Sequence, residues 1–215
     1  MGHPQKVLFA WTMFETYARI GELLQITPLQ VIVPVAHLTG LSTSHPLKRV
    51  SILLHYSENA QPSKTGEYDH CVSLDLPRQI GLAITLARWT ASRPQAAGLW
   101  THTYEEFRKT LIVALANLEV THLAVTAHAF RHGAASHDRA GRDRTAEEVR
   151  LRGNWRSNFS TKRYDKSAML AREWQKLSAY QQKRCERHLK TLQLDYVRLF
   201  AKLFEKADPG SRKSV

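Results

Sequence analysis

The sequence has few cysteines, few acidic residues and no long apolar run, and each shortage excludes a class of protein. Two cysteines, Cys71 and Cys185, are too few for a disulfide framework, and no Cys/His cluster has the ligand spacing of a zinc site. The apolar run near the start, Val7 to Phe14, is too short to span a bilayer and leads into Glu15 and Arg19 rather than a cleavage site. These shortages predict an intracellular protein of the nucleus or cytoplasm, with no export signal and no membrane span.

The shortage of acidic residues leaves the chain strongly basic. Lysine and arginine number 31 against 19 aspartates and glutamates, which gives a formal net charge of +12. A surplus of this size favours a polyanionic partner, with nucleic acid first and an acidic membrane surface second. A basic protein that is merely soluble has the same composition, so the partner must be argued from particular residues.

The patterning predicts an α+β fold that is mainly helical, with a small antiparallel sheet in the N-terminal third. At 215 residues the chain can bury a sizeable core in one domain, 1–207. Within it, 166–207 is predicted to be a C-terminal helical extension, and 208–215 a disordered tail. Apolar periodicity predicts helices over 6–25, 78–91 and 105–118, a central helix starting after Thr126, another starting at Thr145, and strands over 30–33, 49–56 and 68–76.

Three short motifs in the second half of the chain carry the chemistry. His128 and Arg131 are three residues apart, so they share one face of the central helix and can point at a single anion. Gly153-x-Trp155 follows, and nine residues after the tryptophan comes Tyr164 in a basic segment. Cationic groups that hold phosphate oxygens, beside a phenol that can attack, are what cleavage of a phosphodiester by a tyrosine needs.

This ordered set resembles the C-terminal motif of the tyrosine recombinases, the family of phage integrases and mobile-element recombinases. The family pattern is His-x-x-Arg, a glycine followed shortly by His or Trp, and then Tyr. The N-terminal part resembles the family too, because Arg19-Ile20-Gly21-Glu22-Leu23 is similar to the words around its first catalytic arginine. Arg19 lies so near the start that the resemblance implies a catalytic domain without the core-binding domain that usually precedes it.

The resemblance implies a role for each residue. Arg19 and Arg131 would bind the scissile phosphate, His128 would take the proton from Tyr164, and Tyr164 would form a 3′-phosphotyrosine. Lys64, at the tip of the hairpin after the first arginine, would give a proton to the departing 5′ oxygen. Trp155 would position the phosphate, since an indole N–H donates one hydrogen bond but cannot shuttle a proton. Glu22 would orient Arg19, and His132 would support the site or pack in the core.

The implied reaction needs no metal and no cofactor, because basic side chains take the place that magnesium has in nucleases. The implied partner is double-stranded DNA. A basic loop and the segment beside the tyrosine are candidate contacts to the DNA backbone: Arg139, Arg142, Arg144 and Arg163. The C-terminal helices either dock onto a second copy of the chain on DNA or fold back onto their own domain.

Two other functions fit the same residues. A type IB topoisomerase uses a similar set and the same 3′-linked intermediate, but relaxes supercoils without exchanging strands. A non-enzymatic DNA-binding relic of a mobile element would keep the site and lose the activity, because a missing core-binding domain weakens the grip on the duplex. Detection of a covalent protein–DNA adduct separates an enzyme from a relic.

Overall fold

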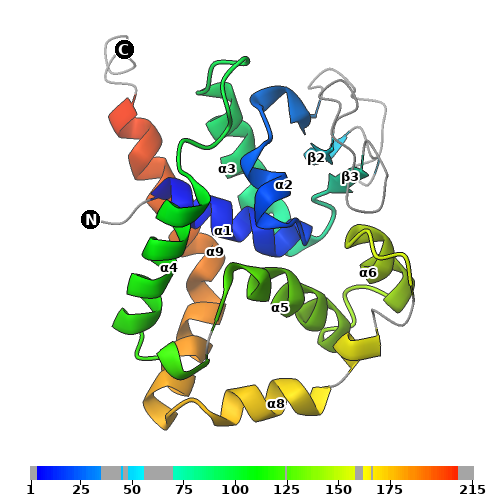
Figure 1. Cartoon of the computed structure of the whole chain (residues 1–215). Coiled ribbons are helices and arrows are strands. Elements are labelled where there is room, and N and C mark those ends of the chain that lie inside the picture. The colour runs from blue at the N-terminus through cyan, green and yellow to red at the C-terminus, as the bar shows by residue number, and fades with distance from the viewer. Residues whose placement is uncertain are drawn as a thin grey trace.

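The structure is a computed structural model that describes residues 4–34, 45, 48–55, 70–123, 125–157, 162–165 and 167–207. The described chain is mostly helical with one small sheet, which confirms the predicted α+β class. The α-helices are α1 (Pro4–Thr16), α2 (Ile20–Leu24), α3 (Ile80–Ala91), α4 (Tyr104–Asn117), α5 (Ala127–Ala140), α6 (Ala146–Arg152), α8 (Ser167–Gln175) and α9 (Ala179–Ala207). Short 3-10 turns are η1 (Pro28–Gln30), η4 (Pro77–Gln79), η5 (Thr121–Leu123) and η6 (Lys162–Asp165). Figure 1 shows α5 in the middle of the molecule, with α1, α2, α3 and the sheet on one side and α8 on the other.

The sheet is antiparallel, as the sequence predicts, and its strands have the order β1-β2-β3. Its strands are β1 (Val31–Ile32), β2 (Ser51–Leu54) and β3 (His70–Ser73), all shorter than the predicted ranges. Ile52 pairs with both Val31 and Val72, so the central strand aligns one buried row across the sheet. The predicted hairpin residue Lys64 lies outside the described residues, as does the predicted tail 208–215.

The first predicted helix, 6–25, is wrong as a single helix. The chain leaves helical geometry after Thr16, and Tyr17 adopts a positive φ of 57°, which is uncommon for a bulky residue. Burial explains the break, because the Tyr17 side chain is 1% exposed and its hydroxyl donates to the Asp138 carboxylate. Arg19 then has extended geometry at the start of α2, so the break changes the direction in which this arginine points.

The main core lies between α1, the sheet, α3 and α4. Phe9 at its centre makes edge-to-face contacts with Trp100 and Phe107, with ring centroids 5.1 and 5.0 Å apart. The helical spacing of Ile80, Ile84 and Ala87 predicts that these residues face inward from α3. This prediction is wrong for Ile80 and Ile84, which are 59% and 48% exposed, whereas Leu82 and Leu86 are buried. Helical spacing cannot choose between two apolar faces of one helix, and packing against α1 and α9 decides.

A second, smaller core lies against α5. Its buried members are Tyr17, Ala134, Ala135, Val149 and Tyr164, and Trp155 packs against them. The run of small residues Gly133-Ala134-Ala135-Ser136 predicts close packing of this helix against a neighbour, and in the structure the segment around Tyr164 packs against α5. The predicted nucleophile is therefore part of a packed cluster.

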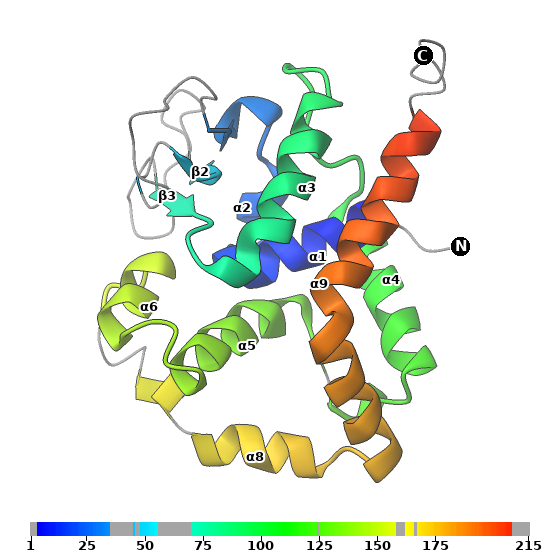
Figure 2. The same ribbon diagram turned by 180° about the vertical axis from the view of Figure 1, so that it is seen from behind.

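The C-terminal helices turn back on the domain. Tyr196 of α9 stacks near Trp11 of α1 with ring centroids 4.4 Å apart, and Phe200 is 2% exposed. Figure 2 shows α9 crossing α1 and lying beside α3 and α4. Of the two predicted arrangements, the structure has the one in which α9 packs on its own domain. Among the helices that the structure describes, none combines the length and the apolar character that crossing a bilayer requires.

Candidate active site

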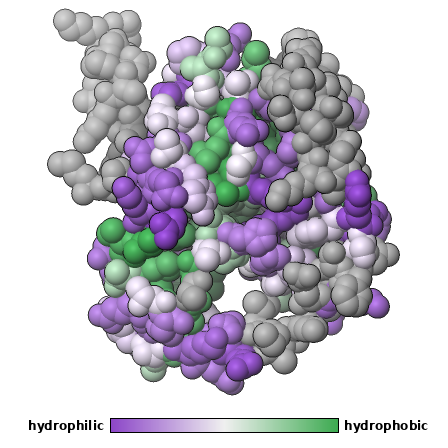
Figure 3. Space-filling view, in the orientation of Figure 1, coloured by the Kyte–Doolittle hydropathy of each residue, from purple (hydrophilic) through white to green (hydrophobic). Residues whose placement is uncertain are grey.

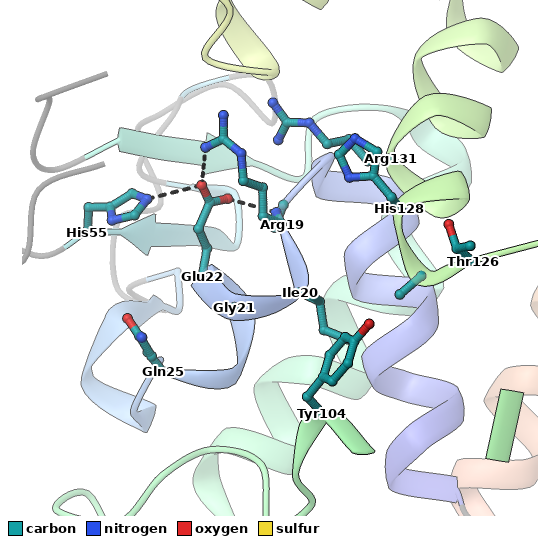
Figure 4. A pocket seen from close by; sticks show the side chains of 12 residues that line it. Arg19, Ile20, Gly21, Glu22, Gln25, His55, Tyr104, Thr126, His128 and Arg131 are labelled. Carbon is teal, nitrogen blue, oxygen red and sulfur yellow. Dashed lines mark hydrogen bonds and ion pairs between the residues drawn. The ribbon is translucent and has the colours of Figure 1, made fainter. Parts of the chain in front are cut away.

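Three of the residues predicted to be catalytic line one cleft. Arg19, His128 and Arg131 surround a hollow of about 600 Å³ between α2 and the start of α5. Figure 4 shows the guanidinium groups of Arg19 and Arg131 on the same side of this cleft, with the His128 ring beside Arg131. Arg19 is 112 residues before Arg131 in the chain, so only the fold brings the two cations together.

Glu22 contacts Arg19, the residue that the resemblance implies it would orient. The Arg19 backbone N–H donates to the Glu22 carboxylate over 2.7 Å, and its guanidinium forms an ion pair with the same group. The ring of His55 adds a contact, with Nε2 3.1 Å from the carboxylate. Burial by itself would raise the pKa of Glu22, but the Arg19 backbone hydrogen bond and the Arg19 charge outweigh it, so the pKa is lowered. Glu22 therefore stays ionised and fixes the direction of Arg19.

Arg131 is deeply buried, and main-chain groups hold it. Its side chain donates to the carbonyl oxygens of Tyr17 and Gly153, and the residue is 3% exposed. Burial first, and then the charge of Arg19, lower the pKa of Arg131 to about 10, so it remains positive at neutral pH. A guanidinium has five N–H donors, so these two bonds leave others for an anion in the cleft.

The Gly153-x-Trp155 motif builds the wall behind Arg131. The Trp155 ring lies 4.7 Å from the Arg131 guanidinium carbon, in cation–π geometry. A Cβ on Gly153 would come within 2.3 Å of that ring, so only glycine fits there. The spacing of Thr145 and Glu148 predicts a capping box at the start of α6. The two residues form it, because each side chain accepts a hydrogen bond from the other's backbone N–H, over 2.6 and 3.2 Å. The motif therefore positions the Arg131 guanidinium, and the Trp155 ring leaves room for no residue other than glycine at position 153.

Tyr164 lies behind the cleft and does not line it. Its side chain is 5% exposed, and its hydroxyl is 2.6 Å from Nδ1 of His132. The Tyr164 ring packs 5.1 Å from Trp155, and the His132 ring meets His128 edge-on at 4.3 Å. His128 lines the cleft, and His132 is one helical turn further along α5, so the two imidazoles connect the cleft to the phenol. The contact predicted for His128 is made by His132.

The cleft has a positive electrostatic character beyond its side chains. The first turn of α5 opens onto it through Thr126, Ala127 and His128. Thr126 is at the predicted N-cap position, but its side chain makes no capping hydrogen bond. The N-terminal end of a 14-residue helix carries a partial positive charge that favours an anion. Among the lining residues that the structure describes, Glu22 is the acidic one, and it faces this helix end and two arginines.

The predicted DNA contacts have different environments. Arg142 is exposed, with a φ of 58°, and Arg139 is half-buried and donates to the Arg144 carbonyl over 3.1 Å. Arg144 requires a correction: its side chain is 7% exposed and is bound by Asp75 and Asp138, so it holds its loop to the domain. Lys64 and the side chain of Arg163 lie outside the described part of the chain.

Arg144 belongs to a buried cluster at the C-terminal end of α5, which we call the α5 network: Tyr17, Asp75, Arg78, Asp138 and Arg144. The Asp138 carboxylate is fully buried and accepts hydrogen bonds from Tyr17, Arg78 and Arg144, the last over 3.1 Å from Nε. Burial would raise the pKa of Asp138, but its hydrogen bonds and the arginine charges lower it. His137 and Asp143 lie close enough to Asp138 to suggest a metal site, but Arg78 already binds both carboxylates.

Two residues of the cleft escaped the sequence analysis. His55 ends β2 and reaches Glu22, a contact between segments that no local pattern predicts. Tyr104 is the first residue of α4, is 45% exposed and lines the cleft opposite the arginines (Figure 4). The capping box of Thr103 and Glu106 could have predicted where α4 begins, but not that its first residue faces the cleft.

Comparisons with models of protein families, with curated proteins and with solved structures found no match to this chain. Its function must therefore be argued from the chemistry of the cleft.

Proposed function

We propose that this chain cleaves and rejoins DNA through a covalent 3′-phosphotyrosine, in the manner that its resemblance to tyrosine recombinases implies. The observation that supports this most is the convergence of Arg19, Arg131 and His128 on one cleft, with the Tyr164 hydroxyl one helical turn behind it on His132. A DNA phosphate in the cleft would meet two guanidiniums, an imidazole and a helix N-terminus, all of which stabilise negative charge.

The proposed reaction begins with the phenol. In the tautomer with a proton on Nε2, Nδ1 of His132 first accepts the Tyr164 proton, and the phenolate oxygen then moves into the cleft and attacks phosphorus. The P–O5′ bond breaks, and a general acid protonates the departing 5′ oxygen, the role proposed for Lys64. Arg19 and Arg131 stabilise the charge that builds on the non-bridging oxygens. Attack by a 5′-hydroxyl then reverses the steps, restores the phenol and reseals the DNA.

The buried position of Tyr164 sets a condition on this mechanism. The phenol packs on Trp155 and is bonded to His132, so its oxygen must leave His132 and enter the cleft beside His128 before it can reach a phosphate. The closed arrangement keeps the nucleophile away from solvent and from wrong phosphates. DNA binding would supply the free energy for the opening movement.

The same burial favours a second candidate, a DNA-binding module that grips a phosphate without cutting it. In this reading Tyr164 is a packing residue of the smaller core, as most half-polar aromatic residues are. The cleft would still bind an anion, because Arg19 and Arg131 do not depend on the phenol. The two candidates differ in one observable, the covalent adduct.

A nicked suicide duplex, which loses its 5′-hydroxyl strand after cleavage and so traps the adduct, tests the proposal. The unaltered chain should give a denaturation-resistant protein–DNA band, and Tyr164→Phe should abolish the band while duplex affinity changes by less than about threefold. Tyr104→Phe is the matched control, because it removes a cleft phenol that the mechanism does not use. Absence of the band from the unaltered chain, or loss of the band only in Tyr104→Phe, contradicts the assignment. Relaxation of supercoiled plasmid without paired sites would indicate topoisomerase activity rather than recombination.

A further inference from the structure

The first third of α9 presents a basic face that the cleft does not use. Tyr180, Lys183, Arg184, Arg187 and His188 surround one shallow depression of about 100 Å³. Their spacings of three, one, three and one residues place them on the same side of the helix. Gln181, which is buried, and Cys185, which is half-buried, lie on the other side, and Arg184 is the half-buried member of the five. We call these five residues the α9 basic face.

The cations of the α9 basic face are not used to hold the fold. Tyr180 is 71% exposed, and Lys183, Arg187 and His188 are exposed as well. Within the described part of the chain, no carboxylate forms an ion pair with Lys183, Arg184 or Arg187. The arginines of α6 differ in this respect, since Arg150 is paired with Glu147. Unpaired cations grouped on one surface favour a polyanion.

The helix that carries this face is firmly anchored. Ser178 and Gln181 form a capping box, with hydrogen bonds of 2.8 and 3.2 Å between side chains and backbone. The Gln181 amide also donates to the Glu119 carbonyl at the end of α4 over 2.9 Å, and Gln182 donates to Leu177 over 3.0 Å. The cationic side chains therefore project from a fixed backbone, which lowers the entropy lost when they bind a ligand.

The dimensions fit a DNA backbone. From Tyr180 to His188 the helix rises about 12 Å, a length over which one strand of a duplex presents three or four phosphates. The 14 residues of α4 span about 21 Å between Tyr104 in the cleft and the turn that anchors α9. That distance is about six base pairs of duplex. Figure 1 shows α4 making this connection, and in Figure 3 the edge where α8 turns into α9 is largely hydrophilic.

We propose that the α9 basic face binds the phosphate backbone of duplex DNA about six base pairs from the cleft. Lys183, Arg184 and Arg187 neutralise phosphates, and the exposed Tyr180 hydroxyl donates to a phosphate or sugar oxygen. The face makes no contacts to bases, so it adds affinity for DNA beside the cleft without sequence specificity. This proposal rests on the proposed function only in taking DNA as the ligand of the cleft.

Binding of two duplexes by a charge-reversed variant tests the surface. Lys183→Glu with Arg187→Glu should lower the affinity for a duplex of about 30 base pairs at least about tenfold, and reduce the slope of log affinity against log salt by about two. A duplex of about 8 base pairs centred on the cleft does not reach α9, so its affinity should change much less. Arg88→Glu with Lys109→Glu is the control, since it makes the same charge change at exposed sites of α3 and α4.

Equal losses in the variant and the control, or equal losses for both duplexes, would overturn the proposal. So would a variant that loses binding to anionic lipid vesicles while keeping its affinity for the long duplex. Lys183→Gln with Arg187→Gln repeats the test without charge reversal if the first variant does not fold. The suicide duplex tests the cleft separately. If the adduct forms but duplex affinity does not depend on the α9 basic face, the proposal for this face alone is contradicted. If affinity depends on the α9 basic face but no adduct forms, the cleavage mechanism alone is contradicted.

Discussion

The two ends of α5 use the same residue types for opposite purposes. At its C-terminal end, Arg78 and Arg144 meet the carboxylates of Asp75, Asp138 and Asp143, so positive and negative charges are balanced inside the protein. At its N-terminal end, Arg19 and Arg131 share the cleft with His55 and His128, and among the described residues that line it Glu22 supplies the one carboxylate. Arginine content alone therefore does not mark a binding site. An excess of cations over buried carboxylates does, because that excess must be met by a ligand or by solvent.

Removal of the central carboxylate of the α5 network should have the largest effect. Asp138→Ala leaves Arg78 and Arg144 without their shared buried partner, and breaking such a pair costs about 3–5 kcal/mol of unfolding free energy. Urea unfolding followed by circular dichroism measures the loss. Glu105→Ala, which removes an exposed ion pair with Arg108, is the control and should leave stability unchanged. A comparable stability for Asp138→Ala and the control would show that the network is not structural.

Removing one arginine from each end of α5 should affect different properties: the rate of adduct formation at the N-terminal end and the free energy of unfolding at the C-terminal end. Arg19→Ala should slow adduct formation on the suicide duplex about 10²- to 10³-fold, since one charge-stabilising donor is removed, and should change stability little. Arg144→Ala should have the opposite pattern. Its free energy of unfolding should be clearly lower, because Asp75 and Asp138 lose their partner, whereas its rate of adduct formation without denaturant should be near that of the unaltered chain. Single-turnover rates and urea curves on the same preparations check both. If the two variants behave alike, the distinction between the ends of α5 fails.

Lowering the pH should reduce the stability that the α5 network contributes, gradually and by less than Asp138→Ala does. The pKa values of Asp75 and Asp138 are lowered in the folded state, because the hydrogen bonds and charges of their partners outweigh the opposing effect of burial. Their contribution to stability is therefore present above the unfolded-state pKa of about 3.9 and is lost as pH falls through the lower folded values. Unfolding free energy measured from about pH 5 downward should fall less steeply in Asp138→Asn than in the unaltered chain. Identical slopes would contradict a lowered pKa at Asp138.

Much of the local structure could be predicted from the sequence. The spacing of His128 and Arg131 predicts a shared helical face, and both residues do line one cleft. The Thr145 to Glu148 capping box predicts the start of α6, and the resemblance of Arg19-Ile20-Gly21-Glu22 to the family motif implies the contact of Glu22 with Arg19. These predictions succeed because each depends on groups within one or two helical turns.

The failures all involve groups that are distant in the chain. The break at Tyr17 depends on Asp138, 121 residues later, and the buried face of α3 depends on α1 and α9. Arg144 resembles a surface loop residue until Asp75 is brought beside it. The partner of the Tyr164 hydroxyl, His132 rather than His128, depends on how η6 packs against α5. Local spacing carries no information about any of these contacts.

The excess of positive charge, the mainly helical α+β class and the local faces that carry His128, Arg131 and Glu22 can all be read from the amino-acid order. The packing of distant segments sets which arginines are neutralised, which arginines face a cleft and where the phenol of Tyr164 lies. Helix capping and side-chain periodicity act over a few residues, whereas the neutralisation of a buried charge depends on whichever distant segment the fold packs against it.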